Sequence, residues 1–478
     1  MKSFKLLVVV FGWLIGLAPL SAADSLPEEA ASALKRAVEF YRGKVAVHGG
    51  YVYRYSDDLA KREGEGKVET EKVWVQPPGT RSVGRAYLEA HELLGEEYLL
   101  RAARDAAECL IQGQLRTGGW RESIEFDPKE RKKFAYRVEK ERERQNNHTT
   151  FDDDKTQSAM RLLMRLDQVL KFKDEKLHEA SLFALDSVVK AQFPSGGWGQ
   201  GYDSFPSPAD YPVKPASYPE SWSRTYPGGK YWYFYTLNDN AMADTIDSLL
   251  LAGKIYGEPK YRNAAIKGGE FLILAQMPEP QPAWAQQYDF DMHPCWARKF
   301  EPASITGGES QGAIRILMRL FVETGDKKFL APIPKALDYL ERSRLPNGRM
   351  ARFYELKTNK PLYFTKTYEL TCDDTDLPTH YGFKLDQLRR ECDSTAKMTE
   401  KELAARREVK PSKPKSSASM EAQVKKLIES LDDRGAWVED GQLKYHGKDD
   451  PTRRVIDSGT FIRNVGTLSR YLAAMRGS

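Results

Sequence analysis

The sequence predicts an all-α fold, an α/α toroid of about six helical hairpins with long loops forming a cleft at one end. Three observations lead to this prediction: a repeated corner ending in an aromatic residue, a repeated helix–turn–helix unit, and scarce strand-like alternation. The chain has 478 residues, with 73 Lys and Arg against 68 Asp and Glu, and four cysteines. This composition does not favour a nucleic-acid partner or a disulfide scaffold.

The first 23 residues have the pattern of a secretory signal peptide. Lys2 and Lys5 precede an apolar run from Leu6 to Leu20, and small residues follow before Asp24. The run is shorter than the ~20 residues that span a bilayer, and no other segment approaches a membrane span. We therefore expect export to the periplasm or the medium, with no integral membrane association. We also expect a monomer.

The repeated corner joins an apolar helical stretch to a Gln-bearing loop and an aromatic ending. The clear copies end at Trp120, Trp198 and Trp284, and weaker copies end at Tyr51, near Arg349 and at Trp437. Each corner is followed by a further helical pattern, so we predict helical hairpins in sequence within one domain from residue 24 to residue 478. A linear superhelix is the structural alternative.

Between corners the chain repeats a helix, a tight turn and a second helix. Glycines followed by charged residues mark these turns at Gly95, Gly257 and Gly325. Apolar residues recur at i, i+3, i+4 and i+7 from Met160 to Leu170. This period is typical of amphipathic helices.

The C-terminal segment is expected to close the ring. Residues from Ile456 onward have an inner-helix pattern, and the basic stretch 391–420 has the composition of a loop or linker. We therefore interpret 391–420 as a loop inside the domain and 421–478 as its closing unit. Cys372 and Cys392 can pair after export, but the sequence leaves this open.

In a toroid the residues just before the inner helices meet at one end. The run Asp152–Asp154 precedes one such helix, and Asn238–Asn240 precedes the next. Each residue can cap a helix, but three consecutive carboxylates need a compensating cation or dipole. Carboxylate and amide oxygens are the ligands that Ca²⁺ prefers. We therefore predict a Ca²⁺ site formed by Asp152, Asp153 and Asp239.

The loop from Gly201 to Tyr235 is rich in Tyr, Trp and Pro. Aromatic residues held by prolines on a polar loop suit stacking on sugar rings. The alternative is a lid whose aromatic residues pack against one another.

Several segments together resemble the polysaccharide lyase family 10 pectate lyases. The matching segments are FDDDKT at 151–156, AQFPSGGWGQ at 191–200, TLNDNAM at 236–242, PAWAQQYDFDMHPCWARKFEPASITGGES at 282–310 and ARFYELKTNKPLYF at 351–364. The resemblance extends from about Ser32 to Phe383. It implies Ca²⁺-assisted β-elimination on polygalacturonate or a related uronate polysaccharide inside an α/α toroid.

The resemblance also implies roles for individual residues. Arg298 matches the arginine assigned as base, and Arg352 matches an arginine that binds the uronate. Lys366 stands where the family has a second arginine, so it keeps the charge but loses the bidentate fork. Asn238 and Glu301 lie in matching segments and are also expected to bind substrate. An arginine base is physically demanding because its free pKa exceeds about 12.

A second departure from the family lies at 152–156, where Asp-Asn-Gly-Ala-Thr is replaced by a more charged Asp-Asp-Asp-Lys-Thr. Other functions therefore stay open. A glycoside or unsaturated-uronyl hydrolase would use paired carboxylates, such as Asp153 and Asp239. A non-catalytic carbohydrate-binding protein is a further possibility. The Gln and Gly-Gly-Trp corner beside an Asp cluster also resembles triterpene cyclases, which an exported, hydrophilic chain does not favour.

Overall fold

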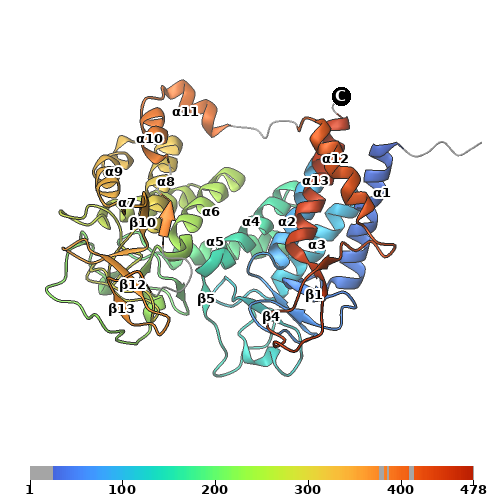
Figure 1. The fold of residues 1–478 in the computed structure, drawn as a ribbon, viewed down its shortest axis with the longest axis horizontal. Coiled ribbons are helices and arrows are strands. Elements are labelled where there is room, and N and C mark those ends of the chain that lie inside the picture. Colours follow the sequence, from blue (N-terminus) through green and yellow to red (C-terminus); the bar gives the residue numbers. More distant parts are fainter. Residues whose placement is uncertain (1–24, 376–381, 385–386, 409–413, 477–478) are drawn as a thin grey trace, which may run out of the picture.

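The helices of the computed structural model form two layers (Figure 1). The structure describes residues 25–375, 382–384, 387–408 and 414–476, so the predicted signal peptide lies outside the described residues. The inner layer consists of α2 (Thr80–Leu94), α4 (Lys155–Val169), α6 (Ala241–Tyr256), α8 (Gly307–Thr324) and α13 (Ser458–Arg476). The outer layer consists of α1 (Leu26–Phe40), α3 (Glu97–Gln112), α5 (Glu175–Lys190), α7 (Pro259–Leu274), α9 (Ile333–Arg342) and α12 (Ala418–Glu429).

The two layers have the arrangement of an α/α toroid, as predicted. Inner helices pack side by side in the order α13, α2, α4, α6, α8, and each hairpin places its second helix outside the first. The last helix, α13, packs against α1 and α2, so the first and last described helices share one side of the molecule. Assignment of residues 24–478 to a single domain stays a prediction.

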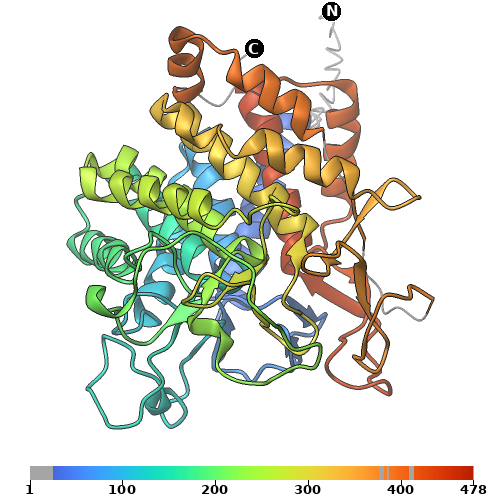
Figure 2. The ribbon, with the colours of Figure 1, turned by 90° about the vertical axis from the view of Figure 1, so that its left-hand side faces the viewer.

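The inner helices all begin at the same end of the molecule. Long loops and short strands gather at that end, below the helices in Figures 1 and 2. The strands are β1 (Arg54–Ser56), β2 (Arg62–Glu63), β3 (Lys72–Trp74), β4 (Ser123–Glu125), β5 (Thr149–Thr150), β6 (Gly201–Tyr202), β7 (Tyr235–Thr236), β8 (Gln287–Tyr288), β9 (Ile305–Thr306), β10 (Arg349–Ala351), β11 (Phe353–Tyr354), β12 (Pro361–Phe364), β13 (Leu370–Thr371), β14 (Gly382–Lys384), β15 (Glu439–Asp440) and β16 (Arg454–Asp457).

The tryptophan of each clear corner is buried and anchored to the preceding outer helix. Its indole N–H donates to a helix carbonyl: Trp120 to Leu110 at 2.7 Å, Trp198 to Val188 at 2.9 Å and Trp284 to Leu272 at 2.8 Å. The weaker corner at Trp437 repeats the bond, to the carbonyl of Leu427 at 2.9 Å. Because buried indoles need an acceptor, this bond fixes where the chain turns back after each outer helix.

The corner glutamines connect neighbouring units. The side-chain amide of Gln114 donates to the carbonyls of Gly118 in its own corner and Ala180 in α5, at 2.9 and 3.0 Å. Gln192 makes the same pair of bonds to the carbonyls of Gly196 and Ala264, the latter in α7. The repeated glutamine therefore joins each corner to the next outer helix.

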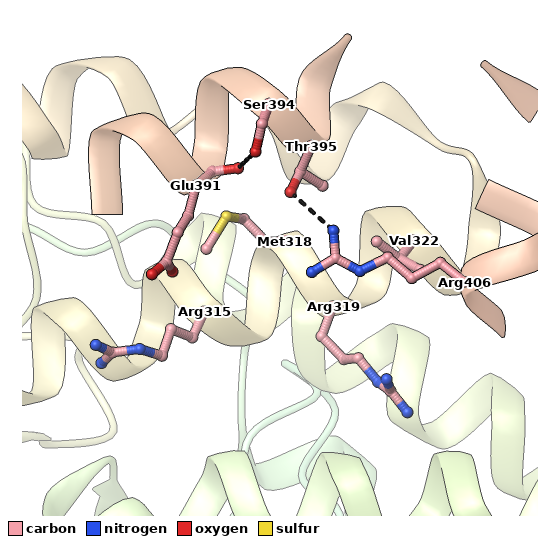
Figure 3. A pocket seen from close by; sticks show the side chains of 8 residues that line it. All are labelled: Arg315, Met318, Arg319, Val322, Glu391, Ser394, Thr395 and Arg406. Carbon is pink, nitrogen blue, oxygen red and sulfur yellow. Dashed lines mark hydrogen bonds between the residues drawn. The ribbon is translucent and has the colours of Figure 1, made fainter. Parts of the chain in front are cut away.

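The interpretation of 391–420 as a loop or linker is wrong for much of that segment. It contains most of α10 (Leu388–Ala396), all of α11 (Glu400–Arg407) and the start of α12. Thr399 and Glu402 form a capping box that starts α11, and Cys392 and Leu403 are buried. Both short helices pack on α8, with a hollow of about 290 Å³ beside them that Figure 3 shows.

The open question about the cysteines has an answer in the described part of the chain. Cys372 is an exposed free thiol and Cys392 a buried one, with its Sγ 3.1 Å from the sulfur of Met318. The two cysteines are therefore not bonded to each other. Among the described helices, none has the length and apolar character needed to cross a membrane.

Gln114→Leu is expected to lower the free energy of unfolding by about 1–3 kcal/mol, because the Gly118 carbonyl loses its donor and the bond from the corner to the Ala180 carbonyl of α5 is lost. Urea denaturation measures this change. Gln168→Leu, at an exposed position of α4, serves as the control and should change stability by about 0.5 kcal/mol or less. Equal effects of the two substitutions would contradict the bridging role of Gln114.

Candidate functional site

Two turns with the same backbone precede the inner helices α4 and α6. They are η3 (Asp152–Asp154) and η6 (Asn238–Asn240), and in each the second and third residues have positive φ, between 48° and 60°. Positive φ is uncommon outside glycine, and Asp and Asn adopt it more readily than other residues. The shared backbone therefore presents Asp153 and Asp239 at equivalent positions.

The tryptophan corners hold the segments that lead into these turns. The N–H of Thr150 donates to the Trp120 carbonyl, and the N–H of Thr236 donates to the Trp198 carbonyl, both at 3.0 Å. Each threonine lies two residues before its turn. The corner therefore sets the position of the turn, and with it the position of the carboxylates.

The next corner along the chain holds the following residue of each segment. The N–H of Phe151 donates to the Gln200 carbonyl at 2.7 Å, and that of Leu237 donates to the Gln286 carbonyl at 2.8 Å. Strand β5 pairs with β6 and β7 with β8 at the same places. Each turn is therefore fixed from two consecutive units.

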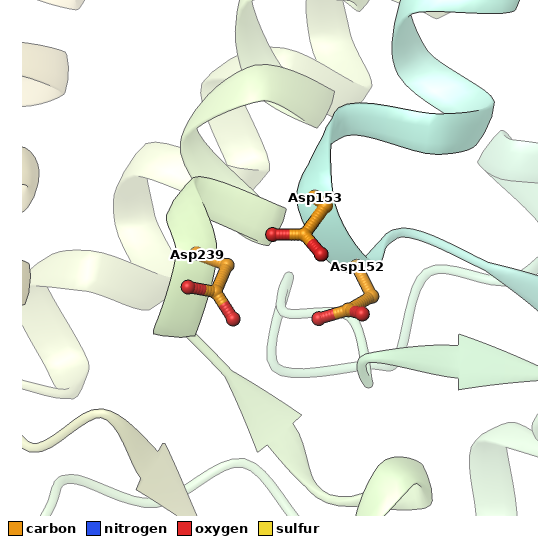
Figure 4. A group of neighbouring side chains, drawn as sticks. All are labelled: Asp152, Asp153 and Asp239. Carbon is orange, nitrogen blue, oxygen red and sulfur yellow. The ribbon is translucent and has the colours of Figure 1, made fainter. Parts of the chain in front are cut away.

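The structure brings the predicted metal ligands together. Asp152, Asp153 and Asp239 each offer a carboxylate oxygen, and these oxygens lie within 4.8 Å of one another. Figure 4 shows the three side chains pointing toward a common space between η3 and η6. Three convergent carboxylates form a hard-oxygen donor set, which fits Ca²⁺. The side-chain oxygen of Asn238 is buried without a hydrogen-bond partner, while Asn240 is exposed.

Asp154 turns away from this group. Its carboxylate accepts two hydrogen bonds from Arg161, at 2.5 and 2.6 Å, and lies 3.2 Å from Arg81. These arginines supply the compensating charge that three consecutive carboxylates require. Asp154 therefore connects η3 to the inner helices rather than to the metal site.

Arg298 lies beside the carboxylates and is clamped by a buried glutamate. Its guanidinium donates to both oxygens of Glu301, at 2.8 Å from Nε and 2.5 Å from Nη2, and to Asp239 at 3.1 Å. Glu301 has 0% exposure and also accepts from the Asn238 amide at 3.2 Å. The glutamate thus fixes the direction in which Arg298 faces the carboxylates.

The electrostatics of the site reflect an excess of carboxylates. Burial and the nearby Asp152, Asp153 and Glu301 raise the pKa of Asp239 to about 6, although Arg298 lowers it. Burial disfavours charge on Arg298, but its hydrogen bond with Glu301 and the neighbouring carboxylates raise its pKa above the ordinary value. The neighbouring carboxylates raise the pKa of both groups, and a bound cation would reduce that contribution.

The predicted uronate-binding residues are placed differently from one another. Arg352 has its Nη2 at 3.5 Å from the carboxylate of Glu301, so Glu301 connects it to Arg298. Lys366 is exposed in the turn between β12 and β13. The role of Lys366 in substrate binding stays a prediction, as does the role of Glu301, which is buried behind the two arginines.

Sequence reasoning gave no role to three polar side chains that contact the carboxylates. The ammonium of Lys155 lies 2.8 Å from Asp152 and 3.5 Å from Asp153. Gln200 donates to Asp152 at 2.7 Å, and Gln76 donates to Asp153 at 3.0 Å. Gln200 had a usable signal, since glutamine follows the corner tryptophan by two residues at both 200 and 286. Gln76 comes from another unit and had none.

A hollow of about 430 Å³ adjoins Asp152. Its wall contains Arg121, His148 and the aromatic run Tyr231–Tyr233. Burial lowers the pKa of His148, with Arg121 acting in the same direction, so the imidazole is neutral at pH 7. The hollow therefore offers a basic group and aromatic faces beside the carboxylates, which suits an acidic sugar.

The aromatic loop from Gly201 to Tyr235 packs against neighbouring segments. Tyr211 packs edge-to-face on Phe193 and Phe290, which lie outside the loop, both with ring centroids 4.8 Å apart. The hollow is lined by Lys230 and Tyr231–Tyr233 from the C-terminal part of the loop and by Asp203 from its start. Sugar stacking stays a prediction for the C-terminal part.

Part of the chain is similar to a known enzyme family. Residues 114–324 match the family model of pectic acid lyases. The predicted site residues within this range are Asp152, Asp153, Asn238, Asp239, Arg298 and Glu301. No curated protein matches the chain.

Solved structures similar to the chain have low sequence identity to it. A mutant of the family 10 polysaccharide lyase from Cellvibrio cellulosa, in complex with trigalacturonic acid, is 17% identical with a TM-score of 0.46, covering 66% of this chain and 97% of that one. A D-mannose isomerase is 13% identical with a TM-score of 0.43, covering 94% and 97%. The cellobiose 2-epimerase from Spirochaeta thermophila is 16% identical with a TM-score of 0.41, covering 70% and 75%.

Asp239→Asn is expected to stabilise the metal-free protein at pH 7 by about 1–2 kcal/mol, allowing for partial exposure. The folded-state pKa of Asp239, about 6, lies above that of an unfolded aspartate. The cost of ionising it in the folded protein is therefore absent below about pH 4 and complete above about pH 6. Urea unfolding in chelator between pH 4 and pH 7 measures the gap between variant and wild type.

The matched control is Asp154→Asn, which loses the ion pairs with Arg161 and Arg81 and should destabilise the protein at pH 7. An Asp239→Asn protein less stable than wild type in chelator at pH 7 would show that the ionised Asp239 carboxylate does not destabilise the folded protein.

Proposed function

We propose that the protein is an exported lyase that cleaves polygalacturonate or a related uronate polysaccharide by Ca²⁺-assisted β-elimination. The observation that carries the proposal is the meeting of three carboxylates with Arg298, whose Nη2 is 3.1 Å from Asp239. The match of residues 114–324 to pectic acid lyases supports it. Export rests on the N-terminal sequence pattern alone.

The chemistry of a uronate explains why both signs of charge are needed. The proton at C5 is α to a carboxylate, and the negative charge of that group opposes its removal. Arg352 can donate to the substrate carboxylate, and Arg offers a bidentate fork for this purpose. In the elimination, the C5–H and C4–O bonds break, a C4–C5 double bond forms, and the leaving oxygen gains a proton.

Asp152, Asp153 and Asp239 would hold the calcium ion. When bound, Ca²⁺ supplies positive charge that stabilises the enolate-like carboxylate as the C5 proton leaves. Gln200 and Gln76 orient two of these carboxylates through their amides. The hollow beside Asp152 would hold a neighbouring sugar of the polymer.

Arg298 is the proposed base. In the metal-free protein the carboxylates keep it cationic, since they raise its pKa. A cation on the three aspartates would remove part of that effect and so increase the neutral fraction of Arg298. Glu301 keeps the side chain oriented, and we propose that its role is to position Arg298 and Arg352.

A glycoside or unsaturated-uronyl hydrolase is the second candidate. The pKa of Asp239, about 6, suits a general acid, and its carboxylate oxygens approach those of Asp153 within 4.8 Å. Retaining glycosidases keep their two carboxyl groups about 5 Å apart. The nature of the product separates this candidate from the lyase.

Polygalacturonate incubated with the protein and Ca²⁺ is expected to give products whose C4–C5 double bond absorbs ultraviolet light. Alginate and other uronate polymers, assayed in parallel, define the substrate class. Chelation should abolish the absorbance, and added Ca²⁺ should restore it. Reducing sugar without this absorbance would identify a hydrolase, and no reaction with any polymer would favour a binding protein.

Arg298→Ala is expected to reduce kcat by roughly 10²–10⁴-fold, the range typical of a lost general base. Arg298→Lys should recover little, because a lysine ammonium cannot donate to both oxygens of Glu301 from a planar fork as the guanidinium does. The wild-type rate should rise with pH as the base loses its proton. Arg101→Ala, at an exposed site on the outer helix α3, is the control. Unchanged turnover of Arg298→Ala would remove Arg298 from the mechanism.

A further inference from the structure

Lys155 places a positive charge inside the carboxylate group. Its Nζ lies 2.8 Å from Asp152 Oδ2 and 3.5 Å from Asp153 Oδ2. The residue is only 5% exposed, so this ammonium is held by the aspartates rather than by water. Two of the three proposed metal ligands therefore already share a cation that belongs to the chain.

The position of Lys155 is unfavourable without these aspartates. It is the first residue of α4, where the helix dipole disfavours positive charge. Burial adds a further cost for an ammonium group. The contacts with Asp152 and Asp153 offset both costs, so lysine and aspartates depend on one another in the folded protein.

The oxygens of Asp152 are both engaged in the metal-free protein. Gln200 donates to Oδ1 at 2.7 Å, while Lys155 contacts Oδ2. A divalent cation that binds Asp152 must share one of these oxygens with Gln200 or Lys155 or displace that partner, and on either oxygen it lies on the same carboxylate as the ammonium. Like charges repel at such distances, and the burial of Lys155 weakens the screening of that repulsion by solvent.

We propose that Lys155 is a resident cation of this site, which holds the aspartates together without metal and weakens their affinity for Ca²⁺. The inference rests on the proposed function only in taking these aspartates as the Ca²⁺ ligands. The site is then partly neutralised at low Ca²⁺ concentration and takes up a calcium ion only when Ca²⁺ is abundant.

The test is calorimetric titration of the purified full chain with CaCl₂. Lys155→Met keeps the length of the side chain and removes its charge, and it should bind Ca²⁺ roughly 10-fold more tightly or better. Lys155→Arg keeps the charge and should bind Ca²⁺ about as weakly as wild type. Lys173→Met, at an exposed lysine beyond the end of α4, is the control.

Thermal unfolding gives a second readout that is independent of activity. In chelator, Lys155→Met should melt below wild type because three aspartates then lie together with one cation fewer. Saturating CaCl₂ should raise its melting temperature more than that of wild type. If Lys155→Met does not fold, Lys155→Gln replaces it in both measurements.

A folded, uncharged variant that binds Ca²⁺ no more tightly than wild type would overturn the proposal. Failure of the lyase function would be a separate result, since it requires wild type to leave every uronate polymer uncleaved. The Ca²⁺ affinities of wild type and variant are measured without substrate.

Discussion

The hydrogen bond from a threonine N–H to a corner tryptophan carbonyl is the constraint on which the site depends. It occurs at Thr150, Thr236 and Thr306, each time at 3.0 Å and each time just before an inner helix. The tryptophan is itself anchored by its indole to the preceding outer helix. The buried tryptophan is therefore bonded both to an outer helix and to the threonine that precedes the next inner helix, so it fixes the threonine relative to the outer helix. A toroid with looser corners would keep its helices but lose the approach of Asp152 and Asp239.

The site that these corners position contains more negative than positive side chains, held in a defined geometry. Glu301 clamps Arg298, Lys155 contacts Asp152, and burial together with the neighbouring carboxylates raises the pKa of Asp239. Folding such a group costs free energy, which the burial of the inner and outer helices supplies. A metal ion or an acidic substrate bound between basic groups would relieve part of this cost. In the proposed function, binding of Ca²⁺ and substrate would therefore relieve an electrostatic repulsion that is already present in the folded protein.

The fold could be predicted because its defining interactions are local in sequence. The indole of Trp198 bonds to Val188, ten residues earlier, so a fixed pattern of apolar residues, Gln, Gly and Trp encodes each corner. Convergence of the aspartates followed from the repeat alone. The helices α10 and α11 were missed because a basic, polar composition masks a capping box at Thr399.

The side-chain contacts of the site could not be predicted from the sequence. Lys155 contacts Asp152, whereas Asp154 contacts Arg161. This difference depends on two consecutive residues with positive φ, which cannot be predicted from the composition. The approach of Gln76 to Asp153 joins segments far apart in the chain. These contacts determine the charge of the site, and only the three-dimensional structure reveals them.

The two turns η3 and η6 are copies of one backbone with different side chains. At the first position one copy has Asp152 and the other Asn238, at the third Asp154 and Asn240, and only the middle position keeps aspartate in both. One turn therefore supplies three carboxylates, and the other supplies one carboxylate and two neutral amides. Because the backbone is the same in both, an exchange between aspartate and asparagine at these positions would change the charge of the site and leave the scaffold as it is.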